Sequence, residues 1–313
     1  MSLLSIVSEP AKADTKAVCH YLTVQGMKQY TGGVTTQAID GEKLLQLTSE
    51  DLLSLGFTEH HATLLMNNIA RMQHIVALDD ALPVKKALCK MEYTPQYLEI
   101  LDLTGQPLGK NLDQFRALVQ GLETNSLLTR LNLRGCALDD SSADLIGALV
   151  ANNGAQLTPV DRHRDGCIQD LCLANNRLSH NCATEDAARS IATALRGNAT
   201  LHTLDLSQNC LKEGGASAFT EFLQSPGSES QLLGLDLSGN RITSTSAKDL
   251  VDGLVSKACP VKVLALAKNY VFDSTAAEAL TAFAKLRGKT VRFGASTEDE
   301  EGEDGGDGGG SKG

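Results

Sequence analysis

The residue types best suited to chemistry gather in one stretch of this 313-residue chain. Four side chains that could coordinate zinc lie close together, Cys167, Cys172, His180 and Cys182, with His163 nearby. Zinc favours tetrahedral sites built from such ligands. However, C-x4-C-x7-H-x-C is not a familiar zinc spacing, and Cys172 would point out of a strand while Cys182 lies beyond the following turn. Free thiols are therefore the prediction, and metal binding stays open as the alternative.

Two other motifs resemble catalytic ones but lack the required context. Gly288-Lys289-Thr290 is similar to the end of a phosphate-binding loop, yet Phe283 stands where that loop needs glycine and a helix is expected before it. Cys19-His20 falls where a helix would bury the cysteine and expose the histidine. No HExxH, GxSxG or dinucleotide fingerprint occurs. The sequence predicts a protein that is not an enzyme and needs no cofactor or metal.

Composition narrows the class of partner. The net charge is −10 and tryptophan is absent, so general binding to nucleic acid or anionic lipid is not expected. No apolar run approaches the ~20 residues of a membrane span, and the N-terminus does not resemble a signal peptide. Eight scattered cysteines without CxxC pairs indicate reduced thiols. We expect a cytoplasmic location, with association to the cytoskeleton as a further option.

The elements that would position any site come from a repeat. "LHTLDLSQNCL" at 201–211 and "LLGLDLSGNRI" at 232–242 share a pattern that occurs six times in all. The central leucines of the six copies are Leu101, Leu131, Leu171, Leu204, Leu235 and Leu264. This pattern is that of the leucine-rich repeat. We expect the Asn of each copy, such as Asn209, to bond the backbone of neighbouring turns.

A helical pattern follows each copy, with apolar residues three and four positions apart. Examples are Phe115/Leu118/Val119/Leu122 and Ala276/Ala279/Leu280/Phe283. Such strand–helix units bury their apolar faces only by stacking. The chain resembles the ribonuclease-inhibitor-like class of leucine-rich repeats. This resemblance implies an α/β solenoid, a horseshoe of six strand–helix repeats with its strands on the concave side.

Residues 15–78 have a different pattern, with short, closely spaced helices and a capping box at Thr48–Asp51. The pairs Tyr21-Leu22, Gly26-Met27, Asp51-Leu52 and Leu55-Gly56 have the spacing of the sterile alpha motif (SAM), which this segment resembles. The resemblance implies a small all-α bundle. The expected organisation is a flexible N-terminus (1–14), a SAM domain (15–78), a connecting and capping helix (79–95), the repeat domain (96–293) and an acidic, Gly-rich disordered tail (294–313).

Side chains flanking the central leucines should line the concave face. Those singled out as binding candidates are Asp102, Arg130, Asp170, Asp205 and Asp236. The aspartates favour a basic partner, although Asp is also simply common at this repeat position, and both interpretations stay open. The 152–166 insertion places Arg162, His163 and Arg164 in a loop that either binds a partner or is passive.

Both resemblances imply a protein–protein interaction adaptor or scaffold in signalling. SAM domains often join an acidic surface to a basic one at the start of the last helix. The acidic residues here are Asp40, Glu42, Glu50 and Asp51, whereas the last helix begins with His60-His61 and offers no Lys or Arg before Arg71. We therefore expect weak or no homo-polymerisation and a basic-surfaced partner, another SAM domain being one candidate.

One alternative function is the regulation of a small GTPase. Ran GTPase-activating proteins, which this chain is similar to in that respect, combine the same repeat class with an acidic tail. RNA binding ranks lower because acids outnumber cations in the front domain.

Overall fold

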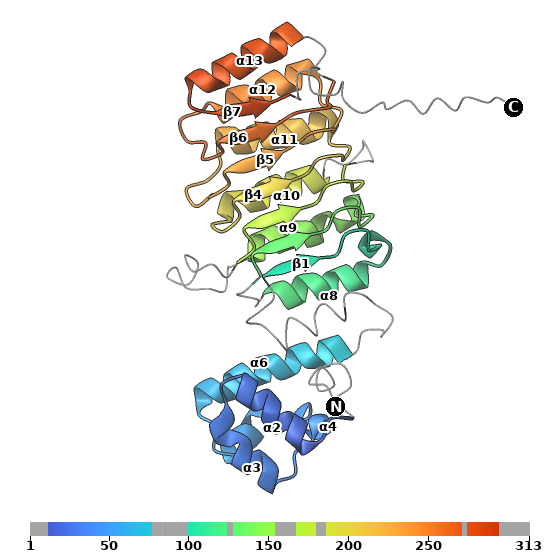
Figure 1. The fold of residues 1–313 in the computed structure, drawn as a ribbon, viewed down its shortest axis with the longest axis vertical. Helices are drawn as coiled ribbons and strands as arrows, with labels where there is room; N and C mark the ends of the chain where they lie inside the picture. Colours follow the sequence, from blue (N-terminus) through green and yellow to red (C-terminus); the bar gives the residue numbers. More distant parts are fainter. Residues whose placement is uncertain are drawn as a thin grey trace, which may run out of the picture.

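The computed structural model describes residues 12–76, 85, 99–123, 128–153, 167–179, 186–270 and 274–293. A helical bundle stands at one end, followed by a stack of strands and helices (Figure 1). The bundle comprises α2 (Thr15–Val24), η2 (Lys28–Tyr30), α3 (Thr31–Thr36), α4 (Gly41–Leu44), α5 (Ser49–Ser54) and α6 (Glu59–Val76).

The bundle is held by an apolar core and by capped helix ends. Tyr21, Leu22, Leu52 and Leu65 are completely buried. The predicted capping box is confirmed: the Asp51 backbone N–H donates to the Thr48 hydroxyl oxygen, and the Thr48 N–H donates to the Asp51 carboxylate at 2.8 Å. Within the described residues, no helix combines the length and apolarity needed to cross a membrane.

In the part of the repeat region that the structure describes, seven strands form one parallel sheet in sequence order. The strands are β1 (Ile100–Asp102), β2 (Arg130–Asn132), β3 (Asp170–Cys172), β4 (Thr203–Asp205), β5 (Gly234–Asp236), β6 (Val263–Ala265) and β7 (Thr290–Arg292). Between them lie η4 (Leu108–Lys110), α8 (Leu112–Glu123), η5 (Asp140–Ser142), α9 (Ala143–Asn152), α10 (Asp186–Gly197), α11 (Lys212–Gln224), α12 (Ser244–Leu254) and α13 (Ser274–Leu286).

The register aligns the central leucines, as the repeat predicts. Leu101 pairs with Leu131, and the row continues through each later strand to Leu264. The last strand, β7, adds a member that the prediction of six repeats missed, because Val291 stands in place of leucine. Within the described residues, the solenoid therefore has six strand–helix repeats closed by a seventh strand.

The helices pack along one face of the sheet (Figure 1). The apolar face predicted for α8 is confirmed, since Phe115, Leu118 and Leu122 are buried. The stripe predicted for α13 is wrong at two positions, because Ala279 is exposed and Phe283 is 36% exposed. Only one side of α13 meets a neighbouring helix, because no described helix follows it in the stack.

An asparagine ladder ties successive turns together. Asn209 is 3% exposed, and its amide nitrogen donates to the carbonyls of Leu173 at 3.0 Å and Leu206 at 2.9 Å. Its amide oxygen accepts from the Leu178 N–H at 3.2 Å. Asn176 makes the equivalent contacts one turn earlier. The predicted role of Asn209 is therefore confirmed.

Candidate protein-binding surfaces

The concave face is formed by the side chains on either side of the central leucine row. The register places Asp102, Asn132, Cys172, Asp205, Asp236, Ala265 and Arg292 in one line across the sheet. The second line is Ile100, Arg130, Asp170, Thr203, Gly234, Val263 and Thr290. All of these side chains are exposed or half-buried. All five sequence candidates thus lie on one face.

Three of the concave aspartates also have a local structural role. One carboxylate oxygen of each accepts the backbone N–H two residues later, at 2.8 Å for Asp205 and Asp236 and at 2.9 Å for Asp102. These are Asx turns, which end the strand. The Thr104 hydroxyl also donates to Asp102 and holds the pKa of its carboxyl below the usual range.

Two of the predicted contact residues bind one another. Arg130 Nε donates to Asp170 Oδ2 at 3.0 Å, and the Thr203 hydroxyl donates to Oδ1 of the same carboxylate. The charge of Asp170 is therefore balanced within the sheet. Among the described residues, Asp205 and Asp236 form no ion pair, and they are register partners on neighbouring strands.

A neutral strip adjoins these two carboxylates, and the sequence reasoning did not single it out. Gly234, Val263 and Ala265 lie on β5 and β6, each half-buried. These three residues carry no charge and no side chain larger than valine. The glycine inside the strand was the signal that could have identified the strip.

The candidate metal ligands are not assembled in the part of the chain that the structure describes. No group of three or more His, Cys, Asp or Glu residues there could hold a metal. His163, His180 and Cys182 lie outside the described residues. Cys172 donates its thiol hydrogen to Asp205 Oδ2 at 3.4 Å, and burial raises the pKa of this thiol to about 11. Such a thiol is a poor nucleophile near neutral pH.

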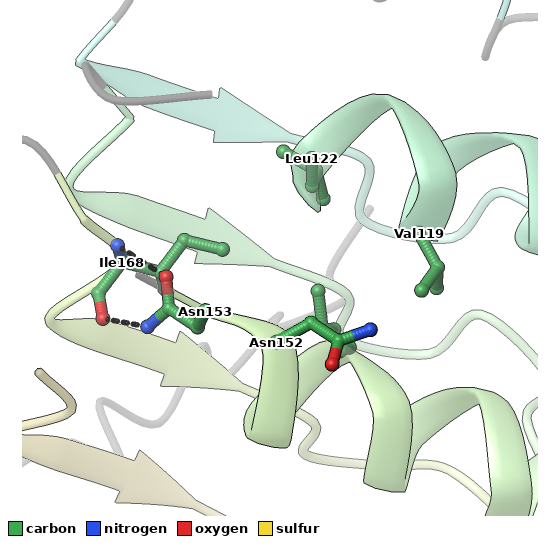
Figure 2. A pocket seen from close by; sticks show the side chains of 6 residues that line it. Val119, Leu122, Asn152, Asn153 and Ile168 are labelled. Carbon is green, nitrogen blue, oxygen red and sulfur yellow. Dashed lines mark hydrogen bonds between the residues drawn. The ribbon is translucent and has the colours of Figure 1, made fainter. Parts of the chain in front are cut away.

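The insertion candidates Arg162, His163 and Arg164 also lie outside the described residues. At the base of the insertion, Asn153 Nδ2 donates to the Ile168 carbonyl at 2.6 Å, and Asn153 Oδ1 accepts from the Ile168 N–H at 3.0 Å (Figure 2). The adjoining cavity of about 10 Å³ is lined by Val119, Leu122, Leu149, Asn152, Asn153 and Ile168. This volume is close to the room that one water molecule requires.

The acidic candidates of the bundle divide into two kinds. Asp40 caps α4 by accepting from the Lys43 N–H at 2.9 Å, and Asp51 belongs to the capping box, where the Thr48 hydroxyl lowers its pKa. Glu42 and Glu50 are exposed in the first turns of α4 and α5. Neither of these two glutamates is the capping residue of its helix. Glu42 and Glu50 are therefore the better probes of binding.

The two histidines at the start of α6 are not equivalent. His61 Nδ1 lies 2.9 Å from both the Tyr30 and the Thr58 hydroxyl oxygens, and Tyr30 stacks on Phe57 with ring centroids 3.8 Å apart. His60 is exposed. The side chain of Arg71 is outside what the structure describes. His61 therefore helps to fix the start of the helix, and His60 is the more accessible of the two side chains.

The phosphate-loop look-alike is a structural turn. Gly288 adopts φ +70° between α13 and β7. Lys289 Nζ donates to the carbonyls of Cys259 and Val261, each at 2.7 Å. The ammonium group of Lys289 therefore binds two backbone carbonyls of the preceding turn, and this motif lacks the context of a phosphate-binding loop.

Comparisons with known proteins agree with both parts of the fold. Residues 12–73 match the SAM domain (Sterile alpha motif) family, and residues 124–147 and 197–219 match the Leucine Rich repeat family. The chain is 29% identical over 139 residues to human "NACHT, LRR and PYD domains-containing protein 14". That alignment covers 44% of this chain and 11% of the relative's own length.

Proposed function

We propose that this chain, a SAM domain followed by leucine-rich repeats of the ribonuclease-inhibitor-like class, is a non-enzymatic adaptor that joins two protein partners in the cytoplasm. Both modules are protein-interaction domains. The concave face binds one partner, and the acidic surface of the SAM domain binds another.

The observation that carries the proposal is the pair Asp205 and Asp236 beside the neutral strip Gly234–Val263–Ala265. The two carboxylates lie on register partners of neighbouring strands. One oxygen of each accepts the hydrogen bond of an Asx turn. The uncharged residues next to them would contact the apolar side chains of an extended segment of a partner. A lysine or arginine of that segment would contact the carboxylates while its neighbours lie on the strip.

Asparagine substitution removes the charge of this pair and keeps its turns. Asn132 occupies the same row and accepts from the Arg134 N–H at 3.1 Å, so a neutral amide makes the same turn. We therefore choose Asp205→Asn/Asp236→Asn as the test variant. The matched control is Asp249→Asn/Asp252→Asn, which removes two exposed carboxylates from α12.

Proximity labelling with mass spectrometry compares the two variants with the parent chain. We expect the concave variant to lose a subset of labelled proteins that the α12 control retains, and the lost set to be rich in exposed basic segments. Identical protein sets for both variants would count against a concave binding site. Glu42→Lys/Glu50→Lys tests the SAM surface in the same way and should remove a different subset.

A GTPase-regulating function is the runner-up, and a hydrolysis assay with candidate small GTPases distinguishes it. On the concave face, Arg130 is held by Asp170, so it would have to leave that carboxylate before contacting a nucleotide. An acceleration of GTP hydrolysis by the full chain would replace the adaptor proposal.

A further inference from the structure

The last two helix-to-strand turns carry a cluster of cations, which we name the basic rim. Its members are Lys257, Lys262, Lys285, Arg287 and Lys289. The first two belong to the turn between α12 and β6, and the other three to the end of α13 and the turn into β7. All are exposed except Lys289, which is half-buried.

Hydrogen bonds hold these two turns side by side. The Thr290 N–H donates to the Lys262 carbonyl at 2.8 Å, and Lys289 Nζ reaches the Cys259 and Val261 carbonyls of the earlier turn. The cations therefore form one surface and not two separate ones. Leu286, 84% exposed, lies within it.

The basic rim is not a general property of the repeat. The turns at 198–202 and 225–233, taken together with the last turns of α10 and α11 before them, contain one Lys or Arg, Arg196. Favourable interaction with helix C-termini would account for Lys257 and Lys285, but Lys262 lies at the start of a strand. No carboxylate of the described residues forms an ion pair with any member of the rim.

The sequence supplies the opposite charge close by. Residues 257–293 contain seven Lys or Arg and two acids, whereas the ten residues 298–307 contain seven acids and no cation. Only residues 293–297 separate Arg292 from the first of these acids. That connection reaches about 20 Å when extended, and β7 spans about 7 Å, so the acidic segment can reach the rim at the other end of the strand.

We propose that the acidic segment 298–307 binds the basic rim of its own chain. Because the segment is tethered, its effective concentration at the rim is in the millimolar range. The contact depends on charge and needs no fixed fold, which suits a Gly-rich sequence. The bound segment shields the rim from other polyanions, and salt releases it.

Zero-length carbodiimide cross-linking of the full chain tests this contact, because it joins carboxylates and lysine amines that touch. At about 0.02 M salt, mass spectrometry should find links from 298–307 mainly to Lys257, Lys262 and Lys285. At about 0.5 M salt their yield should fall about fivefold, since the Debye length shortens. Mixing isotopically light and heavy chains distinguishes cross-links within one chain from cross-links between two chains. Links within one chain support the proposal, and links between two chains overturn it.

Charge-matched variants locate the contact. Lys257→Gln/Lys262→Gln/Lys285→Gln/Arg287→Gln neutralises the rim and keeps Lys289, which has a structural role. The control neutralises four exposed cations elsewhere, Arg196, Arg241, Lys248 and Lys268. The rim variant lacks the lysines that the cross-linker would join, so a different measurement is needed. We compare retention on heparin-agarose between full-length chains and chains that lack residues 294–313.

Deleting the tail should raise the salt needed for elution from heparin in the parent and in the control variant. In the rim variant the same deletion should raise it much less. An equal increase in both variants would mean that the tail acts only through net charge, and the proposal would fail. Cross-links spread evenly over the lysines of the body would also overturn it.

Discussion

Replacing Asn209 with Ala tests the ladder that connects the repeats. The substitution removes an amide that donates to the Leu173 and Leu206 carbonyls and accepts from the Leu178 N–H. The two carbonyls keep a second partner, because Asn176 also donates to Leu173 and Asn240 also donates to Leu206, both at 2.9 Å. The Leu178 N–H has no such substitute, and it becomes a buried, unpaired donor.

The expected loss of stability follows from the one backbone N–H, that of Leu178, that is left without an acceptor. A buried donor without a partner costs about 1–3 kcal/mol, so we expect the free energy of unfolding to fall by about 2 kcal/mol. Asn176→Ala/Asn209→Ala should cost more than the sum of the single variants, by about 1 kcal/mol, because the Leu173 carbonyl then loses both of its side-chain donors.

Urea denaturation followed by far-UV circular dichroism measures these differences, since the chain has no tryptophan to report by fluorescence. Gln231→Ala changes an exposed amide and is the control. A midpoint for Asn209→Ala equal to that of the control would refute the ladder reasoning. Strict additivity of the double variant would refute the shared-acceptor argument alone.

Three further predictions concern other parts of the chain. Lys289→Met should lower the urea midpoint by the equivalent of about 1–3 kcal/mol, because two carbonyls lose their donor; Lys248→Met, at an exposed site, is the control. Cys172 should react with iodoacetamide at pH 8 about a hundredfold more slowly than free cysteine, because its raised pKa leaves little thiolate; the rate should climb toward pH 11, and a flat pH profile would contradict this. By light scattering the full chain should be monomeric at pH 7.5, because the start of α6 offers no Lys or Arg to pair with the acidic side of the bundle; large assemblies at pH 7.5 would contradict the predicted lack of a basic SAM surface.

The repeat pattern predicted most of the solenoid because its information is local. Each copy carries its own strand centre, and stacking then fixes the register, which is why Leu101 pairs with Leu131 although 30 residues separate them. The capping box is equally local, since two residues three positions apart, Thr48 and Asp51, define it. Features of this kind can be identified from the sequence without knowing the neighbours.

The features that were missed depend on neighbours. The strand β7 has Val291 in place of leucine, and only its pairing with β6 identifies it. The exposed face of α13 follows from its place at the end of the stack, because the same apolar pattern in an inner repeat would be covered. The pair Arg130–Asp170 joins residues 40 apart in sequence, across the insertion.

The concave aspartates show why a repeat pattern alone could not decide between structure and binding. The Asx turn explains an oxygen acceptor at this position, but it does not explain a charge, because Asn132 closes the same turn with a neutral amide. At Asp205 and Asp236 two negative charges lie on adjacent strands, an arrangement that costs stability when no cation is near. The turn accounts for the oxygen acceptor at this position, and the basic partner that we propose would account for the charge. Asparagine substitution separates the two contributions, since it should preserve or slightly raise stability while it weakens binding.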